Sequence, residues 1–224
     1  MYANIDLKKD RKIKENDYYK ITFAAVFPVV LWLIHFSAAF LNLNLTSFGI
    51  LPRTFTGLPG ILLAPLIHDD FQHLISNSIP LFILGLGIFY FYPRASLRVF
   101  FFIYFLTDIL VWLFARYAFH IGASGVVYGF VSFLFFSGVF RKDTRSVALS
   151  LLVTFLYGGM IWGIFPSGEK ISWESHLAGL ITGFVASVVF KKFDPPRKYD
   201  WEDEDENPDS GLPEISHDPD KNQF

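Results

Sequence analysis

Long apolar runs separated by short polar segments organise this chain. Each run is close to the roughly 20 residues that a bilayer-spanning helix needs. The runs cover residues 21–41, 71–92, 97–115, 123–140, 147–165 and 173–190. The pattern predicts an all-α membrane protein built as a bundle of six transmembrane helices. A charged fraction of 18%, below the roughly 25% of soluble domains, supports this class.

The sequence divides into three parts. Residues 1–20 form a basic segment, residues 21–192 the six-span domain, and residues 193–224 an acidic tail that we expect to be disordered. Within the domain, residues 42–70 make a long first loop between the first two spans. Its apolar stretch at 58–66 is expected to lie in the membrane interface or to fold against the helices.

The distribution of positive charge predicts the orientation. Fifteen Lys and Arg residues flank the spans on the side of both termini, and three lie on the other side. By the positive-inside rule both termini are cytoplasmic, in a multi-pass protein of the plasma (inner) membrane, and the first loop is extracytoplasmic. The net charge of −2 gives no reason to expect a nucleic-acid partner, and the absence of cysteine excludes thiol catalysis and disulfides.

Three polar residues on three different spans are predicted to share one depth. At about 1.5 Å per residue, Ser124, His176 and Asn77 lie about 24, 21 and 22 Å above the cytoplasmic ends of their spans. His73 precedes Asn77 by one turn and therefore lies on the same helix face. Polar and ionisable groups at such positions indicate a functional site.

These side chains are suited to nucleophilic catalysis. A serine hydroxyl needs a base to take its proton, and His176 is the candidate base. No carboxylate is suitably placed to orient it, since Glu174 is off its face and Asp108 lies deep in the third span. The sequence therefore predicts a Ser–His dyad with Tyr128 packed on the imidazole.

Donors and small residues complete the predicted site. His73, Asn77 and the backbone N–H of Ser124 are candidates to bind a developing oxyanion. Small residues predict close helix packing beside the serine and along the sixth span. These residues are Gly122, Gly125, Gly179 and Gly183.

Gly122-x-Ser124-Gly125, His73-x-x-x-Asn77 and His176 on a glycine-rich last span together resemble the rhomboid intramembrane serine proteases. The resemblance covers about residues 21–192. It implies that Ser124 is the nucleophile and His176 the general base.

The resemblance also implies the roles of the surrounding residues. His73 and Asn77 donate to the oxyanion, Gly122 shapes the oxyanion hole, and Tyr128 stacks on the base. The implied substrates are transmembrane segments of other membrane proteins, cut near their extracytoplasmic ends without metal or cofactor. Many family members carry Trp-Arg in the first loop, where this chain has Leu51-Pro52-Arg53-Thr54. The sequence gives no oligomeric state.

Three other functions are alternatives to intramembrane proteolysis. A catalytically inactive relative would bind membrane clients, but such relatives typically lose the serine or histidine. A small transporter would line a solute path with these polar groups, but no inverted repeat is visible. A zinc enzyme would use His68, His73 and His176, but no His-Glu-x-x-His is present.

Two further hypotheses concern access to the site. His68, Asp69 and Asp70 are expected at its mouth, either admitting water or simply marking a helix boundary. The fifth span, with apolar aromatic residues at Phe155, Trp162 and Phe165, either swings aside to admit substrate or simply faces lipid.

Overall fold

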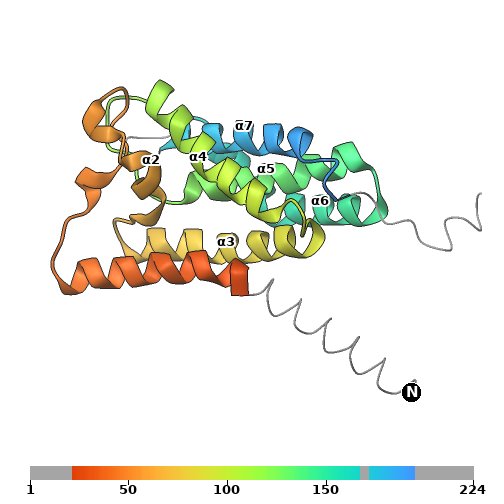
Figure 1. Cartoon of the computed structure of the whole chain (residues 1–224), viewed down its shortest axis with the longest axis horizontal. Helices are drawn as coiled ribbons and strands as arrows, with labels where there is room; N and C mark the ends of the chain where they lie inside the picture. Colours follow the sequence, from red (N-terminus) through yellow and green to blue (C-terminus); the bar gives the residue numbers. More distant parts are fainter. Residues whose placement is uncertain (1–21, 167–171, 195–224) are drawn as a thin grey trace, which may run out of the picture.

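The computed structural model describes residues 22–166 and 172–194, and the regular elements of these residues are helices (Figure 1). The helices in chain order are an N-terminal helix at Thr22–Phe40, η1 (Thr46–Phe48), η2 (Phe55–Gly57), α2 (Gly60–Leu63), η3 (Ala64–Leu66), α3 (Phe71–Phe91), α4 (Ser96–Phe114), α5 (Ser124–Arg141), α6 (Thr144–Tyr157), η4 (Gly158–Ile164) and α7 (Trp173–Val189). The predicted all-α membrane architecture is confirmed.

Among the described residues, five helical stretches are long and apolar enough to cross a membrane, whereas α7 has 17 residues. The fifth predicted span is not a uniform α-helix. It is α-helical to Tyr157 and then tightens into the 3₁₀ helix η4. Glycine is a weak helix former, and Gly158 and Gly159 stand at this change. In η4 the backbone carbonyl groups of Met160 and Gly163 accept hydrogen bonds from side chains.

Helix α5 is at the centre of the bundle and packs against α3, α4, α6 and α7 (Figure 1). Its closest partner is α7, because both helices present glycine to each other. A Cβ atom added to Gly179 would collide with the backbone carbonyl of Gly125, and one added to Gly183 would collide with that of Gly129. The two backbones therefore meet directly, which fixes the separation of the helices that carry Ser124 and His176.

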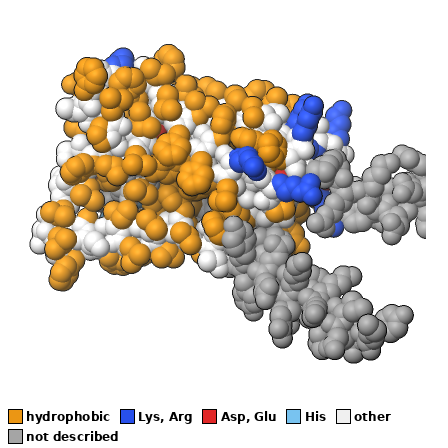
Figure 2. Space-filling model, viewed as in Figure 1, with side chains coloured by type: hydrophobic (Ala, Val, Ile, Leu, Met, Phe, Trp, Pro, Cys, Tyr) orange, Lys and Arg blue, Asp and Glu red, His pale blue; other side chains and the backbone are white. Residues whose placement is uncertain are grey.

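The outer surface has the distribution expected for a protein embedded in lipid. Apolar side chains cover most of the face in Figure 2, and Lys and Arg gather mainly at one end. Phe155 and Trp162 on the fifth span are 86% and 73% exposed. Both side chains therefore lie on the outside of the bundle.

The first loop is fastened to the end of α4. The guanidinium of Arg53 donates to the carbonyl oxygens of Ala115 and Leu113, at 2.7 and 3.3 Å. The indole of Trp112 donates to the carbonyl oxygen of Thr54 at 3.0 Å. The loop has no tryptophan beside Arg53, and a tryptophan from the neighbouring helix contacts it instead.

At the opposite end, Asp194 closes the bundle. Its carboxylate accepts from the backbone N–H groups of Arg94 and Ala95, at 3.0 and 2.9 Å, just before α4. Its backbone carbonyl accepts from Arg141 at the end of α5. Phe193 packs on Phe190. The described bundle thus extends to Asp194, while the predicted segments 1–20 and the tail beyond this residue lie outside the described residues.

Candidate active site

Ser124 is the first residue of α5 and is positioned by the turn before it. Gly122 has φ = +100°, a conformation that L side chains rarely adopt. Its N–H donates to the carbonyl of Ala64, and the N–H of Ala123 donates to Nε2 of His68 at 3.4 Å. No side chain caps the N-terminus of α5. The start of the helix therefore presents backbone N–H groups beside the serine hydroxyl.

His176, in the first turn of α7, lies within hydrogen-bond distance of Ser124. Its Nε2 is 2.9 Å from Ser124 Oγ, and its Nδ1 is 2.8 Å from the carbonyl oxygen of Gly163. A carbonyl only accepts, so Nδ1 carries the proton and Nε2 is left as the acceptor. The neutral ring is thus in the tautomer that takes a proton from serine.

Tyr128 packs on the face of the His176 imidazole, and Gly163 contacts its edge at Nδ1. The Tyr128 ring is stacked on His176, with centroids 4.2 Å apart and planes 8° from parallel. The tyrosine hydroxyl donates to the carbonyl of Met160 in η4. A Cβ atom on Gly163 would collide with that hydroxyl. Gly163 was not predicted, although the glycines in this part of the fifth span were a visible signal of irregular backbone.

His73 and Asn77 approach the same turn from α3. The His73 ring packs on Gly122, where an added Cβ would lie 2.5 Å from ring atoms Cε1 and Nε2. Asn77 is 4% exposed, and among the described residues its Nδ2 has no hydrogen-bond partner. A buried amide donor without a partner is unusual and is available to a ligand. The structure therefore brings His73, Gly122 and Ser124 together, with Asn77 one turn further along α3.

His68 is more deeply placed than the sequence indicated. It was expected at the mouth of the site, but it is 7% exposed, packs against His73, and accepts from the N–H of Ala123. Burial lowers the pKa of His68 to about 3. The ring is therefore neutral at neutral pH, as its acceptor role requires. Asp70 caps α3 by accepting from the N–H of His73 at 2.7 Å, and Asp69 is exposed.

The nearby carboxylates do not orient His176. Glu174 pairs with Arg116 at 3.5 Å, and Asp108 is buried in α4. Neither forms a hydrogen bond with the His176 ring, whose Nδ1 is occupied by the Gly163 carbonyl. Within residues 22–166 and 172–194, no three His, Asp or Glu side chains are grouped as metal ligands would be.

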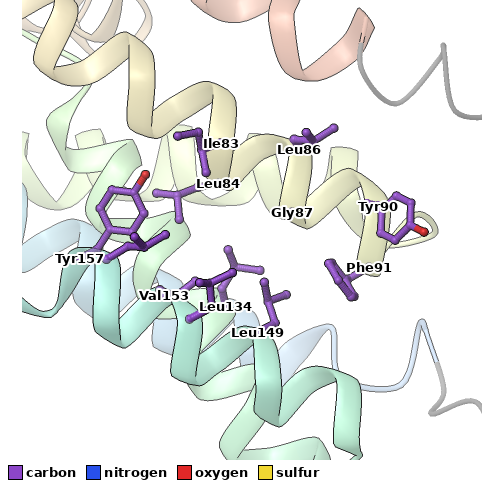
Figure 3. Close-up of a pocket in the computed structure, with 12 residues that line it drawn as sticks. Ile83, Leu84, Leu86, Gly87, Tyr90, Phe91, Leu134, Leu149, Val153 and Tyr157 are labelled. Atoms are coloured by element: carbon purple, nitrogen blue, oxygen red, sulfur yellow. The ribbon is translucent and has the colours of Figure 1, made fainter.

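An apolar groove runs between α3 and α6 (Figure 3). Its volume is about 460 Å³. Ile83, Leu84 and Phe91 contribute from α3, and Leu149 and Val153 contribute from α6. Tyr157 also lines it, immediately before η4, so the groove adjoins the segment that contacts His176 and Tyr128.

Comparisons with known proteins agree with this geometry. A family model described as a rhomboid domain matches residues 56–193. Uncharacterized proteins of Mycobacterium bovis and Mycobacterium tuberculosis are each 32% identical over 192 residues, covering 80% of this chain and 75% of the relative. An uncharacterized protein of Mycobacterium leprae is 31% identical over 189 residues, covering 77% of this chain and 71% of the relative.

Proposed function

This chain belongs to the rhomboid family, whose members are generally intramembrane serine proteases, and we propose that it is an active endopeptidase of that kind. Ser124 is the nucleophile and His176 the general base. The observation that carries the proposal is the 2.9 Å contact between Ser124 Oγ and an unprotonated Nε2 of His176, since an inactive relative has no need of that tautomer.

Acylation follows from the arrangement of these groups. Nε2 of His176 takes the hydroxyl proton as Ser124 Oγ attacks the scissile carbonyl carbon. The resulting oxyanion accepts hydrogen bonds from the Asn77 amide, from His73 and from the start of α5. His176 then gives the proton to the leaving nitrogen, the C–N bond breaks, and an acyl-serine remains. Nδ1–H stays bonded to the Gly163 carbonyl, in place of the carboxylate of a triad.

Deacylation uses the same groups. His176 takes a proton from water, the hydroxide oxygen attacks the acyl carbon, and the C–Oγ bond breaks as the proton returns to Ser124. Each step moves a proton between oxygen or nitrogen and one imidazole. The reaction therefore requires only residues of this chain and water.

The substrates we propose are transmembrane segments of other proteins, cut near their extracytoplasmic ends. The site lies at the ends of α3, α5 and α7 that are opposite the end where Lys and Arg gather, and this distribution supports cytoplasmic termini. The apolar groove between α3 and α6 supports lateral entry from the bilayer. A crosslink between these helices that leaves cleavage unchanged would remove this route.

The test uses the purified full-length chain in detergent and in proteoliposomes. A fluorescent fluorophosphonate reports activated serine, and a panel of single-span test proteins reports cleavage, with cut sites mapped by mass spectrometry. We expect labelling and cleavage by the wild type, and loss of both in Ser124→Ala and His176→Ala. Ser132→Ala is the matched control, because this serine lies on the same helix and donates to the carbonyl of Leu180, away from Ser124 and His176.

The competing function is client binding without catalysis. It predicts that wild type and Ser124→Ala bind the test proteins equally and that neither cuts them. Folded protein that shows no difference between these two variants in labelling or cleavage would overturn the proposal. A label that survives Ser124→Ala would place the reactive serine elsewhere.

A further inference from the structure

A buried histidine outside the dyad joins the two segments that carry Ser124 and His176. His120 lies in the short loop between α4 and α5, four residues before Ser124, and is 3% exposed. Its Nε2 is 3.0 Å from the carbonyl oxygen of Arg116, and its Nδ1 is 2.6 Å from Ser172 Oγ. Its backbone pairs with Ile50 of the first loop through two hydrogen bonds of 2.9 Å.

The partners of the His120 ring fix the direction of each bond. The Arg116 carbonyl only accepts, so Nε2 is the donor and a neutral ring leaves Nδ1 as an acceptor. Burial lowers the pKa of His120, which favours the neutral ring. Ser172 therefore donates its proton to Nδ1. Its oxygen then accepts from the N–H and the hydroxyl of Ser175, at 3.3 and 2.6 Å.

Ser172 is also the N-cap of α7, so the imidazole holds the start of the helix on which His176 stands four residues later. Glycine contacts fix the separation of α5 and α7, and the tightest of them lie deeper, at Gly179 and Gly183. In the first turn of α7 the glycine packing is looser, since a Cβ atom added to Gly125 would lie 3.1 Å from the carbonyl oxygen of Ser175. The first turn of α7 is held from the side by the ring of His120, and by the 3.5 Å ion pair of Arg116 with Glu174.

We propose that His120 is a positioning residue for the reaction: through Ser172 it sets the first turn of α7 so that His176 Nε2 stays in line with Ser124 Oγ. This inference rests on the proposed function. An imidazole suits the task because it is rigid and offers a donor and an acceptor on opposite sides. A small displacement of a catalytic group, of the order of 1 Å, lowers the rate about 100-fold.

The test measures the rate of fluorophosphonate labelling over a range of probe concentrations, which separates the maximal rate from the half-saturating concentration. In His120→Leu we expect the maximal rate to fall about 100-fold, with half-saturation unchanged within about threefold. His120→Asn keeps an acceptor near the Nδ1 position and should recover at least about tenfold of that loss. Ser172→Ala, which also removes the N-cap of α7, should be at least as slow as His120→Leu. The double variant should be no slower than Ser172→Ala, because the contact between His120 and Ser172 is lost in both single variants.

Ser132→Ala is again the matched control. It removes a partly buried hydrogen bond of 2.7 Å between the same two helices, away from the first turn of α7. For this variant we expect a loss of thermal stability comparable to that of His120→Leu, with a maximal labelling rate near that of the wild type. If its rate falls as far as that of His120→Leu at equal loss of stability, the effect is general loosening and the proposal is wrong.

Two other results would also overturn it. One is labelling at the wild-type maximal rate by folded His120→Leu and Ser172→Ala. The other is additive losses in the double variant. If His120→Leu does not fold, Ser172→Ala decides alone, since it removes a single oxygen atom. A wild type that is not labelled at Ser124 defeats the proposed function itself, which distinguishes the two failures.

Discussion

Lowering the pH from 7 to 5 is expected to take about 2 kcal/mol from the free energy of unfolding through His68 alone. Its side chain is 7% exposed, and burial lowers its pKa from 6.5 to about 3. Below pH 6.5 the unfolded chain binds a proton at this ring that the native protein does not bind until near pH 3. Stability therefore rises with pH across this window and is unaffected by His68 above it. One pKa unit corresponds to about 1.4 kcal/mol.

The comparison that isolates this effect is wild type against His68→Gln. The glutamine does not titrate, whereas every other group, including the buried His120, titrates in both proteins. Unfolding is followed by titration with sodium dodecyl sulfate in detergent micelles at pH 7 and pH 5, with circular dichroism as the signal. The wild type should lose about 2 kcal/mol more than the variant between the two pH values.

Equal losses in the two proteins would refute the reasoning. Such a result would mean that His68 is protonated in the native state at pH 5, and hence that it does not accept a hydrogen bond from Ala123 there. The stability of the variant at pH 7 does not enter this test, because each protein is compared with itself.

Three further changes have expected outcomes. Gly179→Ala should lower the free energy of unfolding by about 1–3 kcal/mol through overpacking. At Gly159 an added Cβ meets nothing within 4 Å, so Gly159→Ala should leave the melting temperature within about 2 °C of the wild type or raise it. Tyr128→Leu, which removes the ring stacked on His176, should slow labelling about tenfold, and Tyr128→Phe less than about threefold. Asp194→Ala should cost about 1 kcal/mol of stability in thermal denaturation, while the exposed Asp69→Ala should not.

Much of the site followed from the sequence because depth in a membrane is readable. The length of each apolar run places its polar residues, so Ser124, His176 and Asn77 could be assigned one depth before any contact was known. The glycines beside them indicated close packing. Helix boundaries in the structure agree with the predicted spans to within a few residues at each end.

The contacts that orient Ser124 and His176 could not be predicted. The partner of His176 Nδ1 is the backbone carbonyl of Gly163, and any residue type supplies a carbonyl; its direction depends on where α6 gives way to η4. His120 stood in a loop without periodicity, so its burial depended on how three distant segments meet. His68 was placed at the mouth because its neighbours Asp69 and Asp70 are polar, but the fold of the first loop buries it.

The first loop gives a similar lesson. Its sequence has no tryptophan next to Arg53. In the folded bundle, however, the indole of Trp112 in α4 donates to the carbonyl of Thr54. Sequence position and spatial position are separate properties here, because the loop and the end of α4 meet only in the folded bundle.

The contacts of Asp194 join two segments of the bundle that are made far apart in time as the chain is synthesised. The N–H groups of Arg94 and Ala95 donate to a carboxylate that lies about 100 residues later in the chain, at Asp194. Likewise, α5 packs against the glycines of α7, which are synthesised after it. Until the chain has been synthesised through Asp194, the backbone groups before α4 and the glycines of α5 lack these contacts. His176 arrives with the same helix. A partly synthesised chain therefore contains Ser124 without His176, and the candidate site is assembled only when α7 packs on α5.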